Sequence, residues 1–269
     1  MSQVLSRRAA LRRPRARGVP SPTVVRGLSV AAGLALWELY GRALSTPIFT
    51  YPTAVARAFA DTVVKGELWF FLRSSLVVLV LGLALAVVVG IPAGILMARR
   101  PLIEHAADPY VNALYATPLV AVIPLIVLWL GFEIKAKVVL VFLFCVFPIL
   151  INTYQGVKSA DGRLVEVARS FCSGEGALWR DVILPSAMPF IIAGIRLAIG
   201  RGLIGMVVSE FYTTITGLGY MIVQYANTFK TDRLFVPIVV LMAMGVGLTS
   251  ALRVLERRVA PWLYLGREE

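Results

Sequence analysis

The sequence predicts an all-helical membrane protein with six spans. Of its 269 residues, 58% are hydrophobic and only 16% are charged, whereas soluble domains carry about 25% charged residues. A helix needs about 20 consecutive apolar residues to cross the hydrocarbon core of a bilayer. Four uncharged runs satisfy this length, and a soluble core rarely contains even one. They are residues 74–98, 109–132, 138–157 and 234–252.

Two further apolar segments complete the six expected spans. Residues 24–44 include Trp37 and Tyr40, aromatic residues placed as in the interfacial belt of a membrane helix. A cleaved signal peptide is the alternative for this segment, but its length and internal charge favour an uncleaved first helix. Residues 188–209 form the fifth span. The charged residues within the two segments are Arg26, Glu38, Arg42, Arg196 and Arg201.

Residues 211–229 are also uncharged but rich in threonine, glutamine and asparagine, which makes them poor lipid-facing material. A seventh span here would move Arg253 and its basic neighbours to the other side of the membrane. We therefore expect a shallow or re-entrant segment on the outer face, with a spanning helix as the open alternative.

The basic residues set the expected orientation. The net charge is +12. Six spans place both termini on one side, which carries 17 Lys and Arg residues against 8 on the other. The positive-inside rule makes the richer side cytoplasmic. The positive net charge is therefore explained by the excess of basic residues on the cytoplasmic side, and a nucleic-acid partner is disfavoured.

The most polar internal segment, residues 158–186, lies in an expected cytoplasmic loop. Asp161 is a suitable N-cap for a helix that begins near Gly162. Ser173 can cap a second helix over residues 177–184, followed by Pro185 at the entry to the fifth span. Such a helix-turn-helix suits docking into a groove of a soluble partner. An interfacial helix that rests on lipid headgroups is the alternative.

This segment resembles the signature of permease subunits of ABC importers, which reads Glu-Ala-Ala, three residues, Gly, nine residues, Ile, one residue, Leu-Pro. Here the same spacing holds Glu166-Val167-Ala168, then Cys172, Val182 and Leu184-Pro185. Cys172 replaces the glycine of the turn, so we expect Gly174 and Gly176 to close it. The stretches "YATPLVAVIPLIVLWLGF" and "VVSEFYTTITGLGYMI" are similar to the nitrate, sulfonate and taurine branch of these permeases.

The resemblance implies the type I importer permease fold, a multi-pass protein of the bacterial inner membrane with cytoplasmic termini. It implies two copies of an ABC ATPase subunit, an extracytoplasmic substrate-binding protein, a permease homodimer and no cofactor or metal. The implied parts are a tail over 1–23, a first helix over 24–44, a transmembrane domain over 68–254 with its coupling loop over 158–186, and a tail over 255–269. The implied coupling residues are Glu166, Ala168, Phe171, Cys172, Gly174, Gly176, Leu184 and Pro185.

The sequence contains no phosphate-binding Gly-Lys motif, so ATP must be hydrolysed by another chain. A secondary transporter is the rival class, but it would carry paired repeats and midplane acidic residues. An intramembrane enzyme is disfavoured, because the chain has one histidine and no His-Glu-x-x-His. The cargo is expected to be a small anion or zwitterion, with a vitamin precursor or another small solute as the alternative.

Two sets of residues in the membrane are candidates for function. Arg201 lies near the midplane, where an arginine needs a partner or a wet cavity. We place it in the translocation path, with Arg196 and Asn112 as further candidates; snorkelling to headgroups is the simpler fate of Arg196. A small-residue stripe forms either a dimer seam or packing within one protomer: Gly194, Ala198, Gly202 and Gly205, extended by Ser209.

Overall fold

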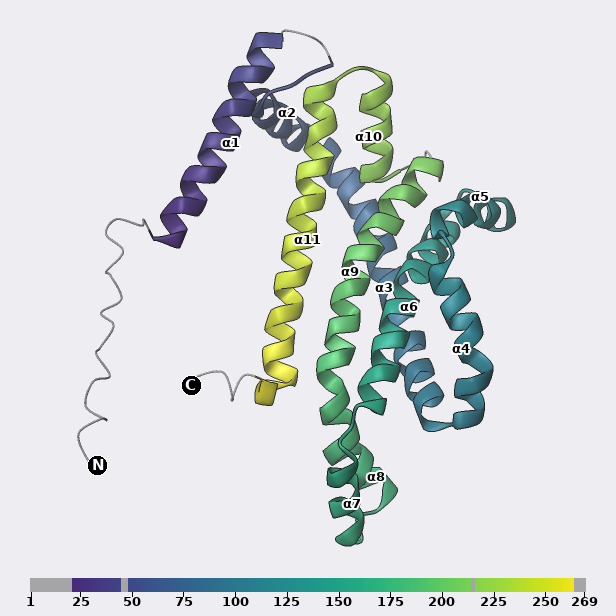
Figure 1. The fold of residues 1–269 in the computed structure, drawn as a ribbon. Helices are drawn as coiled ribbons and strands as arrows, with labels where there is room; N and C mark the ends of the chain where they lie inside the picture. Colours follow the sequence, from purple (N-terminus) through teal and green to yellow (C-terminus); the bar gives the residue numbers. More distant parts are fainter. Residues whose placement is uncertain (1–20, 45–47, 214–215, 264–269) are drawn as a thin grey trace, which may run out of the picture.

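The computed structural model describes residues 21–44, 48–213 and 216–263, and all regular elements in these ranges are helices (Figure 1). The expectation of an all-helical fold is confirmed. The helices are α1 (Pro22–Leu44), α2 (Pro52–Val64), α3 (Glu67–Arg99), α4 (Pro101–Ala116), α5 (Leu119–Leu130), α6 (Ile134–Lys158), α7 (Gly162–Ser170), α8 (Glu175–Leu178), α9 (Leu184–Thr213), α10 (Leu218–Asn227) and α11 (Thr231–Val259), with a π-helical turn over Trp179–Ile183 and a short 3-10 turn over Pro261–Leu263.

Four of these helical stretches are long and apolar enough to cross a membrane: Glu67–Arg99, Ile134–Lys158, Glu175–Thr213 and Thr231–Arg258. A fifth span is possible if the bent pair of α4 and α5 counts as one. The remaining expected span, α1, has 23 residues, about 34 Å at 1.5 Å per residue. It is not among the helices that pass the test of apolar content, so the sixth span stays a prediction.

The third expected span, residues 109–132, is not one straight helix. It is broken at Thr117-Pro118, and α4 and α5 meet there at an angle of 97°. A proline disfavours helical backbone in the preceding residue, and Thr117 accordingly has an extended ψ of 132°. Helix α4 also begins earlier than the uncharged run, at Pro101, and so carries Glu104 at its first turn.

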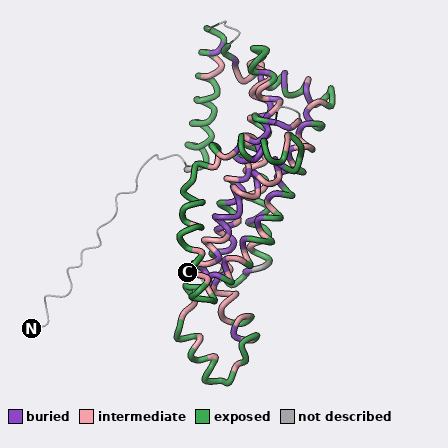
Figure 2. Tube along the Cα trace, turned by 90° about the vertical axis from the view of Figure 1, so that its right-hand side faces the viewer, coloured by how far each residue is buried: buried purple, intermediate pink, exposed green. Residues whose placement is uncertain are grey.

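Helices α3, α6 and α9 form the packed centre of the molecule (Figure 2). The small-residue stripe of α9 lies against α6 in this centre. A Cβ atom on Gly202 would lie 2.7 Å from Cys145 Sγ, and one on Gly205 would lie 2.7 Å from the Phe144 ring. Gly194 faces Asn152 in the same way, and the carbonyl of Ala198 accepts a hydrogen bond from Cys145 Sγ at 3.3 Å. The stripe is therefore covered within one protomer and is not open to a second copy.

At the upper end of the bundle, the short helix α10 lies between the ends of α9 and α11 (Figure 1). Its 10 residues extend about 15 Å, half of the hydrocarbon thickness. The segment over 211–229 therefore does not cross the membrane as a helix, as expected for a shallow segment. Residues 214–215 lie outside the described residues.

Helix α1 stands apart from the centre, and most of its residues are exposed (Figure 2). Its contacts are at its last turns, where Trp37 Nε1 donates to Thr50 O at 2.9 Å and Glu38 accepts from the hydroxyl of Thr53 at 2.7 Å. Helix α1 begins and α11 ends toward the side of the bundle from which α7 and α8 project (Figure 1). Residues 1–20 and 264–269 lie outside the described residues; they include most of the predicted tail over 1–23 and the last six residues of the predicted tail over 255–269.

Candidate functional site

The first helix of the projecting segment, α7, begins where its capping residue predicts. Asp161 is the N-cap, and its Oδ1 accepts a hydrogen bond from the backbone N–H of Arg163 at 2.9 Å. The Arg163 side chain also pairs with this carboxylate at 2.9 Å. These hydrogen bonds from Arg163 hold the pKa of Asp161 below its ordinary value. The expected helix start near Gly162 is confirmed.

The turn after α7 closes at Cys172, which has a left-handed φ of 54°. The N–H of Cys172 donates to Arg169 O at 2.9 Å, and the N–H of Ser173 donates to Ala168 O at 3.1 Å. These two bonds form a Schellman motif, in which the left-handed position favours glycine. This corrects the expectation that Gly174 and Gly176 close the turn. Gly174 has an ordinary φ of −67°, and Gly176 lies inside α8.

The second helix of the segment also differs from its prediction. It starts at Glu175 behind Gly174, with no side-chain cap, so Ser173 is not the cap. It then continues without a break into the membrane helix, giving 39 residues from Glu175 to Thr213. A proline inside an α-helix clashes with the carbonyl four residues earlier. The π-helical turn before Pro185 relieves this clash, because the N–H of Leu184 donates to Trp179 O five residues back.

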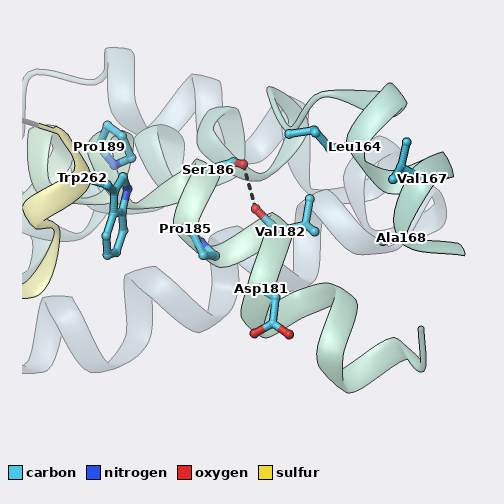
Figure 3. Close-up of a pocket in the computed structure, with 9 residues that line it drawn as sticks. All are labelled: Leu164, Val167, Ala168, Asp181, Val182, Pro185, Ser186, Pro189 and Trp262. Carbon is cyan, nitrogen blue, oxygen red and sulfur yellow. Dashed lines mark hydrogen bonds between the residues drawn. The ribbon is translucent and has the colours of Figure 1, made fainter. Parts of the chain in front are cut away.

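A groove of about 500 Å³ separates α7 from this second helix. Figure 3 shows Leu164 and Val167 on one side and Val182 and Pro185 on the other, with Trp262 and Pro189 at the far end. Of the predicted coupling residues, Ala168 and Pro185 line the groove, whereas Leu184 belongs to the first turn of α9. The groove and its rim give the segment a continuous apolar surface.

The remaining predicted coupling residues lie on the outside of the segment. The side chain of Phe171 is 84% exposed, and Cys172 is exposed beside it. Glu166 is exposed and forms no ion pair within the part of the chain that the structure describes. An unpaired carboxylate and a bare phenyl ring at a projecting turn are what a protein partner can bind.

Two contacts connect this segment to the membrane helices. The Arg99 guanidinium at the end of α3 lies 3.8 Å from the Glu175 carboxylate and 5.3 Å from the centroid of the Trp179 ring. Glu104 on α4 pairs with Lys158, the first residue of the segment, at 2.6 Å. A displacement of the segment would therefore reach α3, α4 and α9 together.

The arginines of α9 have partners on other helices. Arg201 Nη2 donates to the hydroxyl of Tyr115 on α4 at 2.8 Å, and its guanidinium lies 4.5 Å from the centroid of that ring. Asn112 is exposed on α4, one turn before Tyr115. Arg196 pairs with Glu256 on α11 at 2.6 Å, and not with headgroups as expected. Arg201 has no carboxylate partner among the described residues, so its charge is available to an anion.

The sequence interpretation missed a buried polar network at the upper end. Glu210, in the last turn of α9, is 0% exposed. It accepts from the Ser75 hydroxyl at 2.7 Å and from the N–H of Gly219 at 2.8 Å. A Cβ atom on Gly217 would lie 2.0 Å from Glu210 Oε1. The glycines of the "GLG" run were the available signal, because they allow the chain to pass close to the acid.

Lys137, one of the eight basic residues on the expected outer side, belongs to the same region. It is 3% exposed, and its Nζ donates to Thr216 O at 2.9 Å. Within the described ranges, no group of three or more His, Cys, Asp or Glu side chains comes together as a metal site would require.

The family model for the inner membrane component of binding-protein-dependent transport systems matches residues 90–261. Among curated proteins, the chain is 33% identical over 85% of its length to SsuC of Bacillus subtilis (strain 168), a permease protein whose name assigns it to aliphatic sulfonate transport, and covers 84% of that protein. It is 31% identical to the formylaminopyrimidine transport permease protein ThiX of Halalkalibacterium halodurans, over 85% of this chain and 92% of the relative. It is 30% identical to the taurine transport system permease protein TauC of Escherichia coli (strain K12), over 84% of both chains.

Two solved structures share the fold. A chain of an amino acid ABC transporter crystallised with histidines aligns with a TM-score of 0.57 and 21% identity, over 75% of this chain and 98% of the other. A chain of the MetNI methionine ABC transporter in an inward-facing conformation aligns with a TM-score of 0.53 and 18% identity, over 70% of this chain and 93% of the other. At these identities the likeness concerns the fold alone.

Proposed function

This chain belongs to the family of inner membrane components of binding-protein-dependent transport systems, and from that premise we propose how it couples ATP hydrolysis to import and what it carries. It is a multi-pass permease subunit of an ABC importer, and the ATPase is a separate subunit. An ATPase and a substrate-binding protein are therefore its partners in general. A secondary transporter is disfavoured by this family membership.

We propose that residues 158–186 dock into the ATPase subunit, with Phe171, Cys172 and Glu166 at the contact. The supporting observation is the projecting segment itself, which presents an exposed ring, an unpaired carboxylate and an apolar groove outside the bundle. The family signature falls on the same residues. A surface of this mixed kind suits a groove on a soluble partner better than a lipid surface.

The route of coupling follows from the continuous helix between Glu175 and Thr213. Arg201 lies 26 residues beyond Glu175, about 39 Å along this helix. A rigid element of this kind transmits a displacement at one end to the other. Closure of the ATPase subunits would move the segment, and α9 would carry Arg201 relative to α4, where Tyr115 now holds it.

The proposed cargo is a small anion or zwitterion of the sulfonate or taurine type. Two relatives carry names of this class, and Arg201 supplies a cation without a carboxylate partner among the described residues. ThiX, at 31% identity, keeps a formylaminopyrimidine or another small solute as the second candidate. Arg201 favours the first candidate, because a neutral pyrimidine needs no cation within the membrane.

We propose a bacterial inner-membrane location with cytoplasmic termini, a transmembrane domain over residues 68–254 and a homodimer on two ATPase copies. The dimer is inferred from the size of the chain, which lacks an internal repeat and so provides half of a pathway. The seam is not the stripe of α9, which α6 covers in the same chain.

Uptake by reconstituted transporter tests this function. The permease, its ATPase and its binding protein would be placed in proteoliposomes, with the binding protein and the solute outside and ATP inside. We expect ATP-dependent uptake of taurine or an alkanesulfonate, and none from vesicles that lack the ATPase. ATP-dependent uptake of formylaminopyrimidine alone would replace the proposed cargo, and uptake driven by an ion gradient without ATP would overturn the coupling proposal.

A further inference from the structure

A cavity beside Lys137 adjoins a second cavity at the end of the bundle opposite the projecting segment. The first, of about 360 Å³, is lined by Ser74 and Val78 of α3, by Phe132, Glu133 and Ile134 at the start of α6, and by Lys137 and Thr216. The second, of about 580 Å³, shares Ser74, Ile134 and Thr216 with the first and adds Arg73 beside the apolar side chains of Trp69, Phe70 and Val77. The volumes are within the range of sites for small ligands.

The wall of the first cavity holds a buried cation that is incompletely satisfied. The Lys137 ammonium has three N–H donors, and its contacts are Thr216 O at 2.9 Å and Thr216 Oγ1 at 3.4 Å. It forms no ion pair within the described residues. The Glu210 carboxylate attracts it, but the oxygens of Glu210 accept from Ser75 and Gly219. A buried charge without a direct counter-charge favours an anionic ligand.

The hydroxyl groups of this wall are arranged around the same point. Ser74 Oγ donates to Thr216 Oγ1 at 3.0 Å. Both side chains line the cavity next to Lys137. The cavity is also at the N-terminal end of α6, where the helix dipole favours negative charge. Hydroxyls, an ammonium and a helix N-terminus together suit the oxygens of an oxo-acid.

Two unpaired charges of opposite sign complete the lining. Arg73 and Glu133 are exposed, and neither side chain forms a hydrogen bond or ion pair among the residues described. Arg73 belongs to the second cavity and Glu133 to the first. Glu133 would repel a simple anion but would attract an ammonium group on the same ligand. Val78 and Phe132 line the space between these polar groups.

We propose that this cavity is an entry site for a short zwitterion, which binds through a sulfonate-type group to Lys137, Ser74, Thr216 and Arg73 and through an amino group to Glu133. The proposal rests on the proposed import function and narrows its cargo from small anions and zwitterions to amino-substituted anions. The site is distinct from Arg201, which contacts Tyr115 of α4. A solute released from outside would meet Lys137 first.

The phosphoethanolamine headgroup of a lipid has the same chemistry, an oxo-acid anion and an ammonium on a short chain. The test therefore uses the assembled permease–ATPase complex in nanodiscs of phosphatidylcholine alone, without the binding protein. The probes are 2-aminoethanesulfonate and ethanesulfonate, a pair that differs in the amino group, and binding is followed by titration calorimetry. Lipid that copurifies with each variant is identified by mass spectrometry.

The expected pattern has three parts. The native complex binds 2-aminoethanesulfonate more tightly than ethanesulfonate. Arg73→Gln weakens both about two- to fivefold, the effect of one exposed charge, and Glu133→Gln weakens only the amino-substituted probe. Lys135→Gln, which changes an exposed lysine outside the cavity, alters neither affinity. Arg73 and Glu133 are the positions varied, since Lys137→Met would also remove the hydrogen bond that holds Thr216.

Equal binding of both probes to the native complex and to Glu133→Gln would overturn the proposal, as would an absence of binding. Loss of copurified phosphatidylethanolamine in Arg73→Gln, with no probe binding, would assign the cavity to lipid and would also overturn it. Uptake is measured on the same preparations in vesicles. ATP-dependent uptake without binding at this cavity would remove the entry site and leave the importer function standing.

Discussion

The backbone N–H of Ser173 donates to the carbonyl of Ala168 across 3.1 Å, and this bond closes the turn at the tip of the projecting segment. The residue inside the closure, Cys172, has a φ of 54°. Only glycine adopts this conformation without a steric cost, which for other residues is about 1–2 kcal/mol. The tip is therefore held in a strained position by the Schellman bonds around it.

We predict that Cys172→Gly makes the turn more stable by about 1 kcal/mol, because it removes this steric cost. Hydrogen exchange of the peptide over residues 166–178 should slow. Gly174→Ala is the matched control, since Gly174 has a φ of −67° and no atom within 4 Å of an added Cβ. If both variants exchange alike, the strain does not lie at Cys172.

Gly217→Ala should prevent stable folding of the upper end. Gly217 has a φ of 115°, a region that costs other residues about 1–3 kcal/mol, and an added Cβ would lie 2.0 Å from Glu210 Oε1. We expect a loss of monodisperse protein on gel filtration and a lower melting temperature. Gly200→Ala in α9, with open space around an added Cβ, should behave as the native chain. Native-like melting of Gly217→Ala would contradict the described path of the chain past Glu210.

The pair of Arg196 and Glu256 should couple α9 to α11. The Glu256 carboxylate is largely buried, and its Oε2 lies 2.6 Å from Arg196 Nη2. Reversing the charge of either residue alone therefore places like charges in contact. We predict that Arg196→Glu and Glu256→Arg each lower the melting temperature and that the double variant recovers most of the loss. The coupling energy in this cycle should be about 1 kcal/mol. Additive losses would show that Arg196 reaches the headgroups instead.

Arg201→Gln should reduce uptake while the permease still assembles with its ATPase. The substitution removes the cation from α9 and keeps a polar group that Tyr115 can contact. Tyr115→Phe preserves the ring beneath Arg201 but removes the 2.8 Å hydrogen bond, so its effect should be smaller. Binding-protein-stimulated ATP hydrolysis reports assembly independently of uptake. Normal uptake by Arg201→Gln would remove this residue from the path.

Much of the fold could be predicted, because apolar runs of membrane length have few alternatives. The runs identified the centres of α3, α6 and α11 but not their ends. Helix α3 begins at Glu67, seven residues before the uncharged run, since a helix can continue past a charge that lies at the membrane surface. The break at Thr117-Pro118 could have been predicted from the sequence, because residues before proline avoid the helical region.

The site was less predictable where it depends on contacts between distant residues. Arg201 and Tyr115 are 86 positions apart, and Arg196 and Glu256 are 60 apart. No local pattern selects such partners. The closure at Cys172 could have been predicted, since the signature has glycine at this position and glycine favours a left-handed turn. The sequence interpretation instead assigned the turn to Gly174 and Gly176, the nearest glycines in the sequence.

Docking of residues 158–186 on an ATPase subunit can be measured by crosslinking from the native Cys172. This thiol is exposed, whereas Cys145 is buried, so a photoreactive maleimide should label the tip in the unmodified chain. After illumination of the complex in native membranes, we predict a single covalent adduct between the permease and the ATPase subunit. Its yield should fall in Glu166→Lys, which reverses a charge at the contact. Adducts with lipid alone, at the same yield in both chains, would contradict the docking role and assign the segment to the membrane surface.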